Sequence, residues 1–192
     1  MSPADPTALP GSTPHSLLKS ELPALNNQAL EADLTQISAT LLARGWMLAT
    51  AESCTGGMIA AACTELAGSS QWFERGFVTY SNEAKTELLG VPATLIAQHG
   101  AVSEPVARAM AAGAVAHSRA QVAVAVTGIA GPTGGSAGKP VGTVWFGWNV
   151  NGHVTTATRR FDGDRAAVRQ QTLHWACERL NALLHPQANA DG

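Results

Sequence analysis

The sequence predicts an α/β fold in which a mixed, mostly parallel sheet of about five strands lies between two layers of helices. Three observations lead to this expectation. Strand-like runs alternate with helical segments in three units, the run 121–126 is apolar on both faces, and Asn151 and Gly152 separate two strand-like segments. Alternating strands and helices are typical of parallel sheets covered on both faces, and Asn-Gly indicates a hairpin. The expected fold class is therefore a three-layer α/β/α sandwich.

The first 27 residues differ in composition from the rest of the chain. Residues 1–27 hold five of the ten prolines and show no sustained apolar period. Such a segment cannot repay its ordering entropy, so we expect a mobile N-terminal leader. A single domain is expected over 28–186, followed by a polar tail at 187–192.

The first helix is expected at about 28–44. Its apolar positions recur at helical spacing, and Gly45 follows where a helix-ending glycine is common. These positions are Leu30, Leu34, Ile37 and Leu41.

Two strand–turn–helix units come next. The run 46–51 reads as a buried strand, and a helix follows from Thr55-Gly56-Gly57 to about residue 67. The run 77–80 reads as a second strand. The helix after it begins near Ser81 and extends through Leu89, where Gly90 and Pro92 end it.

The second half of the chain supplies the remaining elements. A helix beginning near Ser103 precedes the strand 121–126, which leads into the glycine-rich loop 127–135. The strands 143–150 and 154–161 form the hairpin. A last helix extends from about 164 to 184, and no internal repeat is present.

Composition excludes several classes of function. A formal net charge of −2 and only three lysines argue against a sequence-independent nucleic-acid binder. No apolar run approaches the roughly 20 residues that span a bilayer, and the N-terminus lacks the pattern of a signal peptide, so a cytoplasmic protein is expected. The three cysteines, Cys54, Cys63 and Cys177, show no C-x-x-C spacing and are interpreted as buried or incidental thiols.

Serine, tyrosine and lysine side chains gather at the predicted strand ends. Ser53, Tyr80 and Thr127 each follow a different parallel strand, and ligands of such sheets bind beyond the carboxyl ends of the strands. Lys85 lies one helical turn past Tyr80 and could reach back toward Ser53. A neutral lysine can take the proton of a serine hydroxyl, whereas arginine cannot. The sequence therefore predicts a metal-free nucleophilic site with Ser53 as nucleophile, Lys85 as base and Tyr80 as a relay or support.

Each of these residues also has an ordinary structural interpretation. Lys85 could be a solvated helix residue, Tyr80 an aromatic residue packed on the core, and Ser53 a helix N-cap. Cys54 is a rival nucleophile, although no histidine stands at a comparable strand end. The six histidines show no metal-ligand spacing, so no metal is expected.

Two glycine-rich segments could present backbone N–H groups to an anion such as a phosphate. One begins at Thr55 and the other is the loop 127–135. Neither matches a Walker A or a dinucleotide-binding motif, and either could simply make tight turns. The expected substrate-binding residues are Cys54, Thr55, Gly56, Gly57, Thr127, Gly128, Gly131, Gly134, Gly135 and Arg165.

Six ordered motifs resemble one family, the CinA-like C-terminal domain or nicotinamide-nucleotide amidase family. They are A-E-S-C-T-G-G at 51–57, V-T-Y-S-N-E-A-K at 78–85, G-A-V-S-E at 100–104, T-G-I-A-G-P-T-G-G at 127–135, K-P-V-G-T-V at 139–144 and G-D-R at 163–165. The resemblance extends over about 30–185, and a series of long motifs is far more specific than one glycine pattern.

The resemblance implies a fold and an activity. It implies a five-stranded sheet of order 2-1-3-4-5 with the fourth strand antiparallel, and a homodimer of the stand-alone form. It also implies hydrolysis of nicotinamide mononucleotide to nicotinate mononucleotide and ammonia without a cofactor. By similarity Ser53 is the nucleophile, Lys85 the base and Tyr80 the supporting hydroxyl, and Thr127 and Gly128 line the pocket.

The mechanism expected from these residues is acyl transfer. Ser53 attacks the amide carbon, and N–H groups of residues 54–57 stabilise the oxyanion. An alternative is a non-catalytic nucleotide-binding or regulatory module that uses the same glycine-rich loops. A serine esterase of the α/β-hydrolase type is disfavoured because no G-x-S-x-G motif is present.

Overall fold

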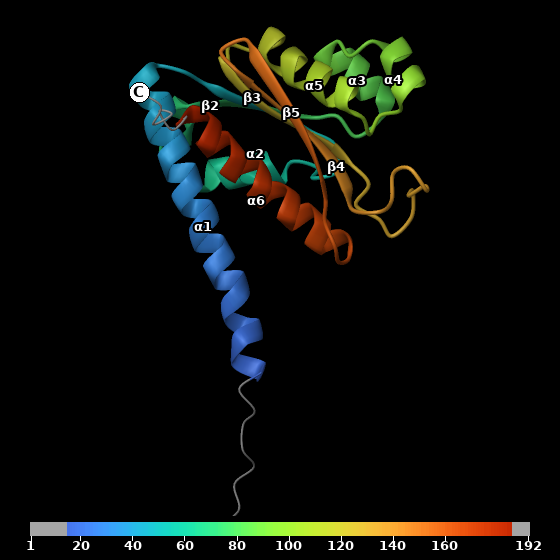
Figure 1. The fold of residues 1–192 in the computed structure, drawn as a ribbon. Coiled ribbons are helices and arrows are strands. Elements are labelled where there is room, and N and C mark those ends of the chain that lie inside the picture. The colour runs from blue at the N-terminus through green and yellow to red at the C-terminus, as the bar shows by residue number, and fades with distance from the viewer. Residues whose placement is uncertain (1–14, 186–192) are drawn as a thin grey trace, which may run out of the picture.

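The structure, a computed structural model, describes residues 15–185, with side chains from residue 27 onward. Helices and strands alternate along much of the chain, as Figure 1 shows. In chain order they are α1 (His15–Arg44), β1 (Leu48–Glu52), α2 (Met58–Glu65), the 3-10 turn η1 (Ser69–Gln71), β2 (Phe73–Val78), α3 (Asn82–Leu89), α4 (Ala93–His99), α5 (Glu104–Ala116), β3 (Val122–Gly128), β4 (Thr143–Val150), β5 (His153–Arg160) and α6 (Arg165–Leu184).

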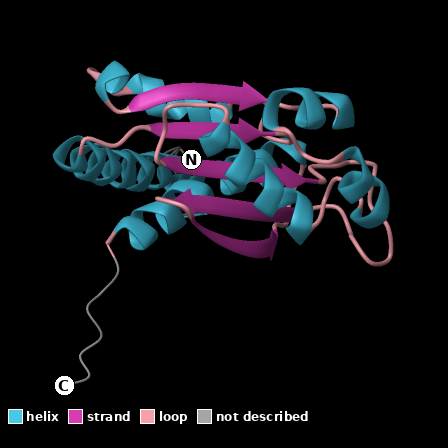
Figure 2. Ribbon diagram, turned by 90° about the horizontal axis from the view of Figure 1, so that it is seen from above, coloured by secondary structure: helices cyan, strands magenta, loops and turns pink. Residues whose placement is uncertain are grey.

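The strands form one mixed sheet in the order β2-β1-β3-β4-β5, seen from above in Figure 2. Strands β2, β1 and β3 are parallel, while β4 is antiparallel to both of its neighbours. The predicted fold class and strand order are therefore confirmed. The carboxyl ends of β1, β2 and β3 meet at one edge of the sheet, which is where ligands of such folds bind.

Helices cover both faces of the sheet. α1, α2 and α6 lie on one side and α3, α4 and α5 on the other (Figure 1). The alternation along β3 shows why. Its valines belong to the core under α1, α2 and α6, whereas Ala123 and Ala125 face α5. Small side chains on that face let α5 approach the strands closely.

Close packing of α5 requires a glycine on β4. A Cβ atom on Gly147 would lie 2.5 Å from the carbonyl oxygen of Ala107 in α5. A side chain there would push the helix away from the sheet, so glycine is the residue that this contact allows.

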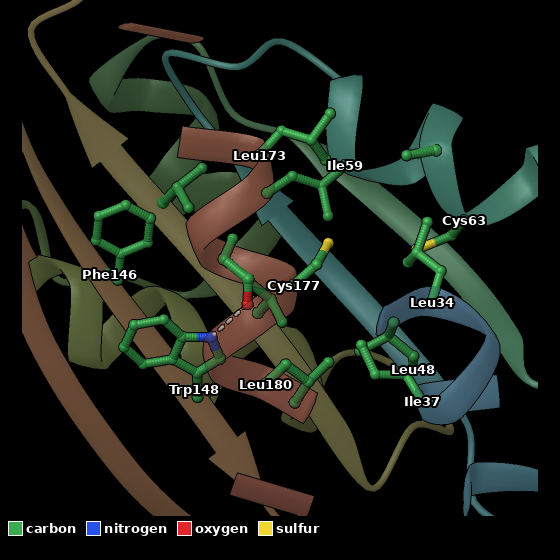
Figure 3. Packing of buried hydrophobic residues seen from close by; sticks show 14 of the residues in the cluster. Leu34, Ile37, Leu48, Ile59, Cys63, Phe146, Trp148, Leu173, Cys177 and Leu180 are labelled. Atoms are coloured by element: carbon green, nitrogen blue, oxygen red, sulfur yellow. Dashed lines mark hydrogen bonds between the residues drawn. The ribbon is translucent and has the colours of Figure 1, made fainter. Parts of the chain in front are cut away.

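Aromatic residues of β4 fill the core on the other face. The Phe146 and Trp148 rings stack with centroids 5.5 Å apart, and both meet the edge or face of Trp175 from α6. The Trp148 indole Nε1 donates a hydrogen bond of 3.0 Å to the Ala176 carbonyl (Figure 3). Each large side chain buried in this way contributes about 1.5–3 kcal/mol to folding, so α6 is firmly anchored to the sheet.

Several boundaries differ from the sequence-based expectation. α1 begins at His15 rather than near residue 28, so the expected N-terminal leader is helical from residue 15 onward. β2 begins at Phe73 rather than at residue 77, because polar residues in its first half conceal an edge strand. The rest of the expected leader, residues 1–14, and the expected polar tail at 187–192 lie outside the described residues.

One helix was not expected. The turn signals at Gly90 and Pro92 predict only a helix end, yet Pro92 is also the N-cap of α4. Proline is common at helix starts, so the same residue can close one helix and open the next. Among the described helices, none is both long enough and apolar enough to cross a membrane.

Candidate functional site

Ser53 sits on a tight turn between β1 and α2 at the carboxyl edge of the sheet. Its backbone N–H donates to Val126 O of β3 at 3.1 Å, and its carbonyl accepts from the Gly56 N–H at 3.1 Å. Gly56 and Gly57 both adopt positive φ, at 62° and 99°, which favours glycine. The turn therefore fixes the Ser53 backbone on the central strands and leaves its side chain 8% exposed.

The buried carboxylate of Glu52 anchors this turn from inside the protein. Its Oε2 accepts hydrogen bonds from Thr55 Oγ1 at 2.7 Å and from the Gly57 and Ile59 N–H groups at 3.0 Å each, and its Oε1 accepts from the Ala60 N–H at 2.8 Å. A negative charge at a helix N-terminus is favoured by the helix dipole. Glu52 thus caps α2, a role that Gly57 at the N-cap position cannot fill.

Two expectations for the turn need correction as a result. The segment that begins at Thr55 was interpreted as one that could bind an external anion, but the Glu52 carboxylate already accepts from the Gly57, Ile59 and Ala60 N–H groups. All four N–H groups of residues 54–57 were expected to face an oxyanion, but Gly56 donates to Ser53 O and Gly57 donates to Glu52. Among the described residues, the N–H groups of Cys54 and Thr55 have no protein partner.

We expect Glu52→Gln to destabilise the protein by about 2–4 kcal/mol. An amide NH2 would face an N–H donor of α2, which leaves buried polar groups unpaired. Urea unfolding monitored by circular dichroism measures the change. Glu104→Gln is the matched control, because the Glu104 carboxylate pairs with Arg108 at the surface and should cost less than about 1 kcal/mol. Equal losses in the two variants would contradict the role assigned to Glu52.

Lys85 reaches the turn from the first part of α3. The helix begins after Ser81, whose hydroxyl accepts from the Ala84 N–H at 3.0 Å. The Lys85 Nζ lies 3.1 Å from Ser53 Oγ, 2.9 Å from Thr79 O and 3.4 Å from Ser81 O. The distance to Ser53 confirms the predicted proximity of the two residues. Lys85 is 1% exposed, which excludes a solvated lysine.

The surroundings of Lys85 favour its neutral form. Burial lowers the pKa of the amine, and among the described residues no carboxylate pairs with it. A neutral amine has two N–H groups and one lone pair. As an ammonium, Nζ donates to Ser53 Oγ and to both carbonyl oxygens. As a neutral amine it can keep its two N–H groups on the carbonyl oxygens, and its lone pair is then available to the Ser53 hydroxyl. This arrangement matches a base that takes the serine proton.

The alternatives for the nucleophile fit the structure less well. Ser53 is not the N-cap of α2, which is Gly57, and its hydroxyl contacts Lys85 instead. Cys54 lies beside it, but burial raises the pKa of this thiol to about 11. The thiol is therefore protonated at neutral pH, and the thiolate is the reactive form. All three cysteines are buried and free, as expected.

Tyr80 is placed differently from the other two members of the predicted cluster. Its side chain is 60% exposed, which excludes packing on the core. Its hydroxyl accepts a hydrogen bond of 2.6 Å from Arg165 Nη2, and Arg165 Nη1 donates to Gly131 O at 3.0 Å. The structure therefore joins Tyr80, Arg165 and the glycine-rich loop, and it records no hydrogen bond from the Tyr80 hydroxyl to Ser53 or Lys85.

The remaining predicted residues lie in and around the glycine-rich loop. Thr127 is buried at the end of β3, and its hydroxyl donates to Ala101 O at 2.9 Å. Gly128 is paired with Val144 in the sheet. Gly131 is buried, while Gly134 and Gly135 are exposed. Within residues 27–185 no group of three or more histidine, cysteine, aspartate or glutamate side chains could hold a metal ion.

Arg169 of α6 contacts the turn between β1 and α2 that holds Ser53. Its Nε donates to Cys54 O at 3.2 Å and its Nη2 to Thr55 O at 2.9 Å. The sequence does not predict this contact, because neither spacing nor periodicity relates α6 to the turn. Glu52 was overlooked as well, although a charged residue at the end of an apolar strand was a usable signal.

Comparison with known proteins gives consistent results. Residues 30–184 match the family described as the CinA C-terminal domain. A protein of Enterobacter agglomerans named nicotinamide-nucleotide amidohydrolase PncC is 61% identical over 137 residues, which are 71% of this chain and 84% of that protein. The protein of the same name from Escherichia coli strain K12 is 56% identical over 146 residues, or 76% of this chain and 88% of that protein.

Solved structures show the same fold. The crystal structure of the competence/damage inducible protein CihA from Agrobacterium tumefaciens is similar with a TM-score of 0.77 and 49% sequence identity. The match covers 81% of this chain and 95% of that one.

Proposed function

The chain belongs to the CinA C-terminal domain family, and on this premise we propose that it hydrolyses the carboxamide of nicotinamide mononucleotide to nicotinate mononucleotide and ammonia. The observation that carries the proposal is the buried Lys85 Nζ, 3.1 Å from Ser53 Oγ and paired with two carbonyl oxygens. Relatives named for this activity cover most of the chain, and the site offers the base and nucleophile that amide hydrolysis needs.

The reaction proceeds in two halves in this proposal. Neutral Lys85 takes the proton of the Ser53 hydroxyl while Oγ attacks the amide carbon, and the oxyanion accepts from the Cys54 and Thr55 N–H groups. The C–N bond then breaks, and the Lys85 ammonium returns the proton to the leaving ammonia. In the second half Lys85 takes a proton from water, the hydroxide attacks the ester, and Ser53 leaves with that proton.

Tyr80 and Arg165 act on the substrate side of the proposal. The Tyr80 hydroxyl holds the Arg165 guanidinium, whose charge suits the phosphate of the nucleotide. Tyr80 therefore supports catalysis indirectly, by placing this cation beside the glycine-rich loop.

The test of the proposed function is an assay of the full chain with nicotinamide mononucleotide, in which ammonia and nicotinate mononucleotide are both quantified. We expect the two products in equal amounts. Binding measured by calorimetry without turnover would reject the enzyme in favour of a nucleotide-binding module. We also propose that the protein acts as a homodimer in the cytoplasm, as the resemblance implies, and a single-chain mass in light scattering would refute the dimer.

The activity should rise with pH. Because burial lowers the pKa of Lys85, the active neutral amine replaces the ammonium as pH increases through that pKa. We expect kcat/KM to increase about tenfold per pH unit below the lowered pKa and to level off above it. A profile recorded from pH 5 to 9 with the wild-type protein measures this, and a flat profile would exclude Lys85 as the base.

A further inference from the structure

Arg169 binds two successive carbonyl groups of the turn that follows the nucleophile. The guanidinium is half-buried and donates to Cys54 O and Thr55 O at 3.2 and 2.9 Å. Among the described residues it has no carboxylate partner, so its charge is directed at these carbonyls. Hydrogen bonds from a charged donor are about twice as strong as neutral ones.

Because the peptide bond is planar, the contact between Arg169 and the Cys54 carbonyl also fixes the direction of the Thr55 N–H. In a trans peptide the C=O of one residue and the N–H of the next point in opposite directions. Holding the Cys54 carbonyl therefore aims the Thr55 N–H away from Arg169. The Cys54 N–H is aimed in the same manner, because the Ser53 carbonyl is held by Gly56.

The hydrogen bonds from Arg169 restrain a turn that its glycines would otherwise leave flexible. Gly56 and Gly57 both adopt positive φ, and glycine reaches many other backbone conformations at little cost. A flip of the peptide between Cys54 and Thr55 would point a carbonyl where the N–H group now lies. Glu52 fixes the far side of the turn through Thr55 Oγ1 and Gly57, but it does not contact this peptide.

We propose that Arg169 is a positioning residue, which aims the Thr55 N–H at the oxyanion without touching the substrate. The inference rests on the proposed function, because it concerns the transition state of amide attack. The N–H of the residue after a serine nucleophile, here Cys54, commonly serves this purpose together with a second N–H, and we assign the Thr55 N–H as that second donor. Here the N–H groups of Cys54 and Thr55 are those left without a protein partner in the described turn.

Arg169→Gln tests the proposal by kinetics. Loss of one oxyanion donor typically costs about 10²–10³ in kcat, so a misaimed donor should cost about 10–10²-fold, with KM changed less than about threefold. Arg44→Gln is the matched control, since the Arg44 guanidinium also donates to a backbone carbonyl, that of Leu184, at 3.0 Å. Both variants should lose similar thermal stability, while only Arg169→Gln should lose kcat.

A sulfur substrate separates positioning from a merely structural role. Thionicotinamide mononucleotide develops charge on sulfur, which is a weak hydrogen-bond acceptor. Arg169→Gln should therefore slow the oxygen substrate about tenfold more than the sulfur substrate. Equal slowing of both would overturn the proposal.

A structural readout keeps the inference independent of the substrate. A crystal structure of Arg169→Gln should show the peptide between Cys54 and Thr55 rotated or in more than one orientation. An unchanged peptide would overturn the positioning role whatever the protein hydrolyses. If the wild-type protein releases no ammonia, the proposed function fails on its own, and the peptide orientation in the variant still decides the role of Arg169.

Discussion

Replacement of Ser53 by alanine should lower kcat/KM for nicotinamide mononucleotide by about 10⁴–10⁶-fold, the range typical of a lost nucleophile. In the proposed mechanism the acyl group is attached to Ser53 Oγ, and alanine offers no atom in its place. Cys54 cannot take over, because burial raises the pKa of its thiol to about 11. Ammonia release at substrate concentrations well below KM measures the effect on kcat/KM.

Ser103→Ala is the matched control for this experiment. The Ser103 hydroxyl is also buried, at 7% exposure, and donates to Gly100 O at 2.8 Å on a neighbouring loop. We expect the activity of Ser103→Ala to stay within about tenfold of the wild type, since Ser103 has no role in the proposed mechanism. Near-wild-type ammonia release by Ser53→Ala would refute the serine mechanism.

Replacement of Lys85 by methionine should lower kcat/KM by about 10³–10⁵-fold, because the serine then lacks a base. Lys85→Arg should not restore the activity, since a guanidinium remains charged and cannot take a proton. The two variants together separate a need for a base from a need for positive charge. Recovery of activity in Lys85→Arg would show that charge, rather than proton transfer, is what Lys85 supplies.

Lys85→Met should lower activity but not the stability of the fold. The lowered pKa means that between this pKa and the ordinary value of a lysine, about 10.4, the unfolded chain binds more protons than the folded one. Wild-type stability therefore rises with pH through this window, and below it the buried charge costs stability. Lys85→Met removes that cost, so it should unfold at an equal or higher temperature than the wild type at neutral pH.

The pairing of Ser53 with Lys85 could be predicted because both follow parallel strands. The carboxyl ends of parallel strands lie at one edge of the sheet, and Lys85, about one turn into α3, reaches back over that edge. The two residues are 32 positions apart in sequence and share a hydrogen bond in the structure. The fold class follows from local patterns, namely the apolar strand 121–126 and the Asn-Gly hairpin, whereas the strand order was expected from the family resemblance alone.

Other parts of the site depend on packing that no local pattern encodes. Arg169 contacts the turn only because α6 crosses the sheet beside α2, at a separation of 114 positions or more. Tyr80 shows the limit of reasoning from strand ends. It follows β2 as expected, but its exposed hydroxyl bonds Arg165 from α6. The end of β2 places Tyr80 at the edge of the sheet, while its hydrogen-bond partner comes from a helix of another layer.

The central claim is that a neutral Lys85 activates Ser53, and its most direct test is covalent labelling by pyridine-3-sulfonyl fluoride, a reagent shaped like nicotinamide. Peptide mass spectrometry locates the label, and its rate is recorded against pH in the wild type and in Lys85→Met. We predict sulfonylation of Ser53 at a rate that rises with pH along the lowered pKa of Lys85 and collapses in Lys85→Met. A label on Cys54 or Tyr80, or an equal rate in both proteins, would contradict the account.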